Sequence, residues 1–147
     1  MEQGLAVVEV QQLLSDWAYE LDTHNGVHIA ELVTEDCVYI LGGAPRTGRA
    51  AIQKFYQERL ERVSAQPEGA PTQRHNLSNL RVSFRSAGDV SITFTLVFFT
   101  SAGMASGTNH ADAAAVADVR MDCRRDQDGQ WRIARFDSNQ SFRRVPA

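Results

Sequence analysis

The sequence has few cysteines and lacks the glycine pattern of a nucleotide-binding loop. Two of its 147 residues are cysteine, Cys37 and Cys123, and no CxxC spacing is present that could hold zinc or an iron–sulfur cluster. Each lies in a segment that alternates as a strand does, which favours buried free thiols over a disulfide. Gly42-Gly43 lacks the third glycine of a dinucleotide fingerprint, so we expect no such cofactor.

Excess positive charge and long apolar runs are also missing. The formal net charge of -3 is unlike that of proteins that neutralise a phosphate backbone, so we expect no nucleic-acid partner. No stretch approaches the roughly 20 apolar residues that span a bilayer. Glu2, Glu9 and Asp16 interrupt the N-terminal segment, which is therefore unlike a secretion signal. The expectation is a cytoplasmic protein that does not bind membranes.

The composition is that of an ordinary globular protein, with 43% hydrophobic and 22% charged residues. A chain of this length fits one domain, which we expect to span residues 1–147. Apolar residues recur every three or four positions in three N-terminal segments, which predicts helices over 5–21, 27–33 and 49–63. A short strand is predicted at 37–41, and four long strands at 73–84, 90–100, 114–125 and 131–142.

This order of elements defines the fold class. Along 90–100 the apolar and polar residues alternate, as they do in an antiparallel sheet with one buried face. Three helices that precede a mostly antiparallel sheet, and cover one face of it, make an α+β protein.

Four local strings make the chain similar to a known superfamily: Trp17–Asp22, Glu31–Tyr39, Arg46–Ile52 and Gly129–Ile133. In this order they resemble the nuclear transport factor 2-like superfamily over nearly the whole chain, in its SnoaL-like and scytalone dehydratase-like branch. The resemblance implies a cone-shaped α+β barrel around one apolar pocket. Because chemistry varies within that fold, function depends on the residues of the pocket.

Two residues match catalytic positions of the scytalone dehydratases. Asp22 corresponds to their aspartate late in the first helix, and His75 to their histidine at the start of the strand after the third helix. Leu21 replaces the tyrosine that precedes the family aspartate, and no histidine corresponds to their second one. An imidazole beside a carboxylate can take and give a proton near neutral pH, which suits the loss of water or another leaving group. We therefore expect Asp22 and His75 to lie within about 2.6–3.2 Å of each other, or one bridging water apart, inside the cone.

The remaining pocket residues are expected to be aromatic or polar. Tyr19, Tyr39, Tyr56 and Asn79 are candidates to donate hydrogen bonds to a substrate oxygen, and Tyr39 is favoured among them. Aromatic residues that could contact a flat ligand, although a core also needs such residues, are Trp17, Phe55, Phe94, Phe98, Trp131 and Phe136. The partner implied is a small aromatic or polycyclic compound.

The leading hypothesis is a cofactor-independent, dehydratase-like lyase that acts on an aromatic or polycyclic hydroxy compound. One alternative is a non-catalytic ligand-binding or assembly subunit that resembles the dioxygenase β subunits. Another is an isomerase or hydrolase that uses Asp112, Asp118 or His110. The ketosteroid isomerase mechanism is disfavoured because Leu41 stands where those enzymes have a catalytic aspartate.

Two expectations concern the surface. The chain is expected to form a homo-oligomer, a dimer or trimer. His24 and His28 are expected at the surface around a turn, and no group of histidines and carboxylates shows metal-ligand spacing.

Overall fold

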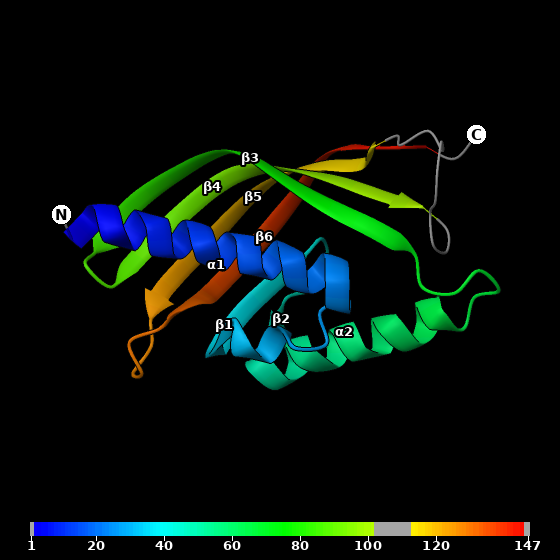
Figure 1. The fold of residues 1–147 in the computed structure, drawn as a ribbon, viewed down its shortest axis with the longest axis horizontal. Coiled ribbons are helices and arrows are strands. Elements are labelled where there is room, and N and C mark those ends of the chain that lie inside the picture. The colour runs from blue at the N-terminus through cyan, green and yellow to red at the C-terminus, as the bar shows by residue number, and fades with distance from the viewer. Residues whose placement is uncertain (1, 102–112, 146–147) are drawn as a thin grey trace.

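Six strands form one curved sheet, and both α-helices lie on the same face of it (Figure 1). The computed structural model describes residues 2–101 and 113–145. Its elements are α1 (Glu2–His24), the 3-10 turn η1 (Ile29–Glu31), β1 (Val33–Leu41), β2 (Arg46–Thr47), α2 (Arg49–Ser64), β3 (Thr72–Ser86), β4 (Asp89–Ser101), β5 (Ala113–Arg125) and β6 (Trp131–Arg143). No helix among these described residues combines the length and apolar character that a membrane crossing needs.

The strand order is β2-β1-β6-β5-β4-β3. β1 and β6 are parallel, whereas the other neighbouring pairs are antiparallel. The sheet bends around the helices as a cone but does not close, because β2 and β3 are its edges. The predicted cone-shaped α+β fold is therefore confirmed, with an open sheet in place of a closed barrel.

The core lies between the sheet and the helices. Apolar residues that recur along α1 every three or four positions are buried, because residues at this spacing share one face of a helix. They include Val10, Leu14, Trp17 and Leu21. The inward positions of β4 are buried in the same way, while Thr93 between them is exposed. Both cysteines are buried and free, as predicted.

The prediction of three helices is wrong for the second of them. Residues 27–33 form only the single turn η1, and β1 begins at Val33, four residues earlier than predicted. Thr34 is fully buried in this part of β1, and the register of β1 against β6 shifts between Val33 and Val38. That irregularity interrupts the two-residue alternation from which a strand is recognised.

Gly26 lets the turn after α1 pack directly on the ring of Tyr56. Its φ is +78°, and a Cβ added there would lie 2.5 Å from Tyr56 Cδ1 and 3.1 Å from Leu21 Cδ2. Positive φ and a near contact with an aromatic ring both require glycine at this position. The turn thereby fixes Tyr56 relative to the end of α1.

Gly26→Ala should lower the free energy of unfolding by about 2–4 kcal/mol, because it adds backbone strain and a clash with Tyr56. Gly4→Ala is the matched control, since Gly4 lies in α1 with no atom near its added Cβ, and it should be neutral or slightly stabilising. Urea unfolding measures both variants. Equal stability of the two would contradict the packing described for Gly26.

The face of the sheet opposite the helices carries no helix among the described residues (Figure 1). Arg120 and Asp122 form an ion pair there, and Arg85 also binds Asp122. A shallow hollow on this face includes Thr93, Asp118 and Arg120. A mixed-charge sheet face of this kind suits a self-complementary contact between two copies.

We predict a homodimer that buries this face. Val97 lies on the outer side of β4, between the inward Leu96 and Phe98, so Val97→Glu should place a charge in the contact and produce monomers. Val8→Glu is the control, because Val8 lies exposed on α1. Sedimentation velocity at micromolar concentration measures the oligomeric state of the wild type and of both variants. A wild-type monomer would rule out the prediction.

Candidate functional site

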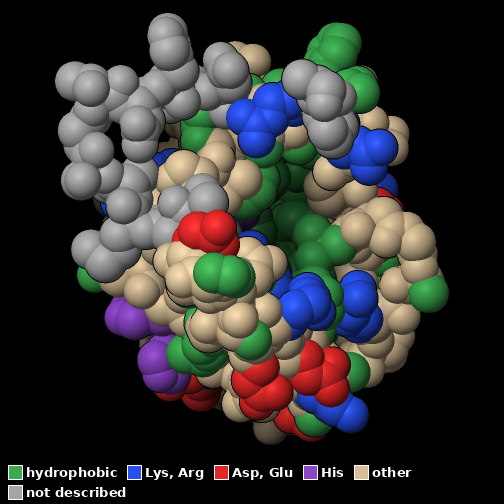
Figure 2. All heavy atoms as spheres, turned by 90° about the vertical axis from the view of Figure 1, so that its right-hand side faces the viewer, with side chains coloured by type: hydrophobic (Ala, Val, Ile, Leu, Met, Phe, Trp, Pro, Cys, Tyr) green, Lys and Arg blue, Asp and Glu red, His purple; other side chains and the backbone are tan. Residues whose placement is uncertain are grey.

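A cavity of about 200 Å³ opens where the middle of α2 meets the end of the sheet. Figure 2 shows this end of the molecule, with a hollow of hydrophobic side chains and Lys or Arg side chains near its rim. The residues that line the cavity are Leu21, Leu41, Phe55, Tyr56, Arg59, Gln73, His75, Leu96, Phe98, Ala115, Ala117, Ser138 and Gln140. The lining is mostly apolar, with a few polar groups, as is typical of small-molecule sites.

Asp22 holds His75 through two hydrogen bonds. Its Oδ1 lies 2.6 Å from His75 Nδ1, and its Oδ2 accepts the backbone N–H of His75 at 3.0 Å. Both side chains are mostly buried, with 12% and 13% of their areas exposed. The ring distance lies within the predicted range, and the bond to the backbone was not foreseen.

The bond to Asp22 sets the tautomer of the imidazole. An ionised carboxylate can only accept, so Nδ1 carries the proton and Nε2 of the neutral ring is left as a base. The ring of His75 also packs against the rings of Trp17 and Phe98. Its centroid lies 5.6 Å from that of Trp17, edge-on, and 4.8 Å from that of Phe98. The ring is therefore fixed at the cavity wall, and Nε2 is the nitrogen that does not bind Asp22.

Three buried side chains form a hydrogen-bonded chain from the core to the cavity. Trp17 Nε1 donates to the hydroxyl of Tyr39 at 3.0 Å, and the hydroxyls of Tyr39 and Tyr56 lie 2.7 Å apart. Tyr39 is fully buried, so its own proton needs an acceptor, and Tyr56 supplies it. With Tyr39 as donor, the proton of Tyr56 remains available toward the cavity, which Tyr56 lines.

Burial raises the pKa of both tyrosines. The pKa of Tyr39 is well above its usual value, mainly because burial disfavours the phenolate and also because of its contact with Tyr56. Burial raises the pKa of Tyr56 to about 12, although the hydrogen bond from Tyr39 and the charges of Arg59 and Arg46 lower it. Tyr56 is therefore a neutral hydrogen-bond donor at physiological pH.

Gln73 links the elements around the cavity. Its Nε2 donates to the backbone oxygen of Leu21 at 2.5 Å, and its Oε1 accepts from Arg59 at 3.0 Å. Burial lowers the pKa of Arg59, which nevertheless stays far above neutrality and keeps its charge. A positive charge therefore lies in the cavity wall.

The structure places the predicted site residues in three positions: lining the cavity, behind its wall, or away from it. His75, Tyr56 and Phe98 line the cavity. Asp22, Trp17 and Tyr39 lie behind the wall, where they support it. Tyr39 was the favoured contact to a substrate oxygen, but it is fully buried and stacks on Phe136, with ring centroids 4.4 Å apart.

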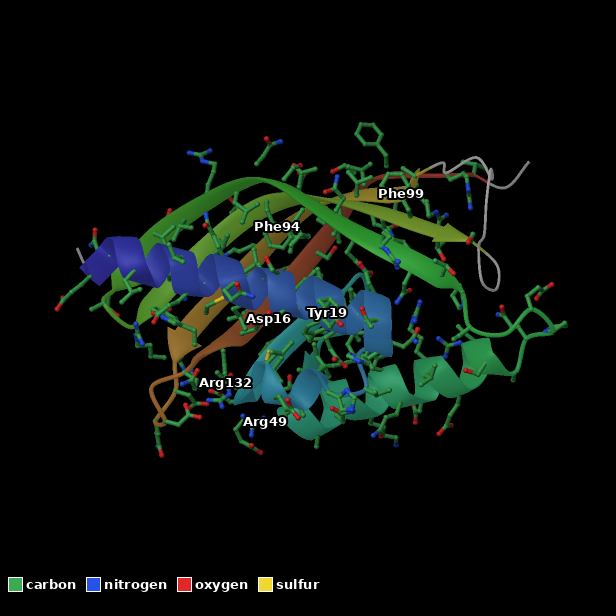
Figure 3. All side chains as sticks on the ribbon, in the orientation of Figure 1. Asp16, Tyr19, Arg49, Phe94, Phe99 and Arg132 are labelled. Carbon is green, nitrogen blue, oxygen red and sulfur yellow. The ribbon has the colours of Figure 1, made fainter. Side chains whose placement is uncertain are left out.

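Tyr19, Asn79 and Phe94 lie away from the cavity, contrary to expectation. Tyr19 is 63% exposed on α1 (Figure 3), because it is two residues past the inward Trp17 and so lies on nearly the opposite side of the helix. Asn79 has a φ of +56° at an irregularity of β3, and it borders the hollow on the outer sheet face. Phe94 is buried in the core and borders that same hollow.

The other aromatic candidates divide in the same way. Phe55 lines the cavity, with the Arg46 guanidinium 3.9 Å from its ring centre. Phe136 is a core residue, and the indole of Trp131 donates to Glu9 near the start of α1. Phe136 and Trp131 therefore belong to the core, as the sequence also allowed.

The alternative acids are not supported at the cavity. Asp118 borders the outer hollow, where it accepts a hydrogen bond from Ser141 at 2.8 Å. Asp112 and His110 lie outside the described residues. Leu41 lines the cavity, so the position that carries an aspartate in ketosteroid isomerases is apolar here.

Two features of this region were missed from the sequence. Arg59, Gln73, Ser138 and Gln140 all line the cavity. Ser138 and Gln140 follow the buried Phe136 at two-residue intervals along β6, and this strand phase was the available signal for them. Contrary to expectation, a histidine and carboxylate group with ligand spacing also exists. Glu20, His24 and His28 hold their ligand atoms within 4.8 Å of one another.

The curved open sheet, its helices on one face and the cavity at its end define a nuclear transport factor 2-like protein. Residues 3–137 match the SnoaL-like domain, and the chain belongs to that family. A search of curated proteins finds no match.

Several solved structures share the fold. A structure from Catenulispora acidiphila in complex with S-DNPA is 22% identical, with 93% of this chain and 94% of that chain covered and a TM-score of 0.74. ActVI-ORFA from Streptomyces coelicolor is 16% identical, with coverages of 92% and 98% and a TM-score of 0.76. A candidate scytalone dehydratase from Novosphingobium aromaticivorans is 19% identical, with coverages of 99% and 93% and a TM-score of 0.76. At these identities the likeness shows the fold alone.

The raised tyrosine pKa values predict a pH effect. The folded-state pKa values of Tyr39 and Tyr56 exceed the unfolded value of 10.0, so their protonated forms stabilise the folded state. This stabilisation is fully present below pH 10 and is lost as the pH rises through about 12. At about pH 11, phenolate absorbance of the folded protein should show Tyr39 and Tyr56 still mostly protonated. In urea all three tyrosines should ionise. Ionisation of all three in the folded state would contradict the assignment.

Proposed function

We propose that this protein is a cofactor-independent acid–base lyase that eliminates water from a small aromatic hydroxy ketone. The observation that carries the proposal is the contact between Asp22 and His75 at the wall of an open cavity. The assembly-subunit interpretation requires no oriented base beside a cavity. The likeness to a candidate scytalone dehydratase and the S-DNPA complex of another relative also favour a small-molecule site.

The cavity limits the size of the ligand. Its volume of about 200 Å³ is below the roughly 300–1,000 Å³ of pockets for drug-sized ligands. Phe55 and Phe98 offer aromatic surfaces on two sides, from α2 and β4. A ligand of one or two fused rings therefore fits better than a larger polycyclic compound.

The residues support a stepwise elimination. His75 Nε2 removes a proton from the carbon beside the ketone, and the electron pair moves to the carbonyl oxygen. Tyr56 donates a hydrogen bond to the resulting enolate, and the charge of Arg59 favours it electrostatically. The enolate then expels the β-hydroxyl, which takes the proton from His75 and leaves as water. His75 returns to its neutral form, and the product gains a conjugated double bond.

Asp22 is a positioning residue in this scheme. It does not line the cavity, but it keeps the proton on Nδ1 and stabilises the imidazolium that forms during the reaction. Because one base removes the proton and returns it to the leaving hydroxyl, both must lie on the same face of the substrate. The scheme therefore implies syn elimination, which deuterium labelling can test.

Variants of the pair test the proposal on a panel of hydroxylated dihydronaphthalenones, with product formation followed by absorbance. His75→Ala should lower kcat by on the order of 10²-fold or more, and added imidazole should restore part of the rate. Asp22→Asn should lower kcat by about tenfold or more with a smaller change in KM. Circular dichroism should show both variants folded.

Asp16→Asn is the matched control for Asp22→Asn. Asp16 lies exposed on the same helix (Figure 3) and bonds only to Gln12 among the described residues, so its loss should leave kcat unchanged. If compounds of the panel bind to the wild type but none is turned over, the ligand-binding interpretation replaces the lyase. Turnover that survives His75→Ala without imidazole would refute the assigned base.

A further inference from the structure

A second group of ionisable side chains lies at the C-terminal end of α1, outside the cavity lining. Glu20 and His24 are one helical turn apart, so their side chains lie on the same face of α1. The chain then reverses at Asn25 and Gly26, both with positive φ. This reversal brings His28 back beside Glu20, and the backbone N–H of His28 donates to Glu20 Oε1 at 2.7 Å.

The three side chains converge as metal ligands do. His24 Nδ1 lies 3.0 Å from Glu20 Oε2, and His28 Nδ1 lies 3.4 Å from Glu20 Oε1. A tetrahedral zinc ion with bonds of about 2.0–2.1 Å separates its ligand atoms by roughly 3.4 Å. The ligand atoms of all three residues lie within 4.8 Å of one another, so small side-chain rotations would complete the set.

Burial differs among the three residues in a way that suits binding from solvent. The Glu20 side chain is only 10% exposed and is held by the N–H of His28, so one ligand is already fixed. The side chains of His24 and His28 are 43% and 57% exposed and can adjust their rings. The two rings contact each other edge-on, with centroids 5.4 Å apart, and their exposure leaves room for a water ligand.

We propose that Glu20, His24 and His28 bind one divalent transition-metal ion, with zinc as the probe. Two imidazoles and a carboxylate suit zinc, copper and nickel, and disfavour magnesium and calcium, which prefer oxygen ligands. The site is separate from the cavity, because none of its three residues lines it. A bound ion would join α1 to the turn that follows it and so stabilise the segment that carries Asp22.

Isothermal titration of tag-free protein with zinc chloride tests the proposal, and one ion per chain is the expected stoichiometry. At about 100 times the dissociation constant, zinc should raise the midpoint of thermal unfolding by roughly 5–10 °C. Magnesium at the same concentration should not. Cobalt(II) should give visible d–d absorption typical of four or five ligands that include nitrogen.

His28→Asn and His24→Asn should each weaken zinc binding by tenfold or more. Both residues are exposed, so the variants should remain folded, as circular dichroism would show. His75→Asn is the control, because it removes a histidine from the cavity and should leave zinc affinity unchanged.

Three outcomes would overturn the proposal. They are no zinc binding by the wild type, binding that His28→Asn does not weaken, and binding that His75→Asn abolishes. The first would leave Glu20 and the two histidines as a simple ion-pair group. The last would place the ion in the cavity. None of these results depends on whether the protein is a lyase.

Discussion

The two hydrogen bonds from Asp22 to His75 connect the end of α1 to the start of β3, and the site depends on them. The bond to the backbone N–H fixes where β3 begins relative to the helix. The bond to Nδ1 fixes the ring. Hydrogen bonds to a charged group contribute about 1.5–3 kcal/mol each, so this one carboxylate has a large share in positioning the cavity wall. Gln73 reinforces the same junction through the backbone of Leu21.

A second constraint is the polar chain inside the aromatic core. Trp17, Tyr39 and Tyr56 each satisfy a partner that would otherwise be buried without a hydrogen bond. The chain is directional, because Trp17 can only donate. That direction leaves the last hydroxyl proton, on Tyr56, to the cavity. Gly26 packs against the ring of Tyr56, so the turn after α1 also determines where that proton lies.

Regular periodicity made most of the fold predictable. In α1, α2 and the four long strands, apolar residues recur with the period of a helix or a strand, and each element was located within a few residues. The short strand β1 was placed four residues late because its register shift breaks the alternation. Asn79 was misplaced for a related reason, since an irregularity in β3 puts it beside the outer face.

The site was predictable only in part. The pairing of Asp22 and His75 came from resemblance to a family and not from spacing, because the residues are 53 positions apart. Tyr19 could have been excluded from its helical phase. His28 could not have been grouped with Glu20, because that contact depends on the reversal at Asn25 and Gly26. Irregular backbone, more than composition, accounts for what the sequence did not reveal.

The central claim is that Asp22 keeps the proton on Nδ1 of His75 and leaves Nε2 as a base at the cavity. Nitrogen NMR of protein labelled with ¹⁵N-histidine tests this most directly, with His75→Asn used to assign the signals. At a pH where the ring is neutral, the account predicts a protonated Nδ1 and an unprotonated Nε2 for His75, and loss of this preference in Asp22→Asn. A proton on Nε2 in the wild type would contradict the account.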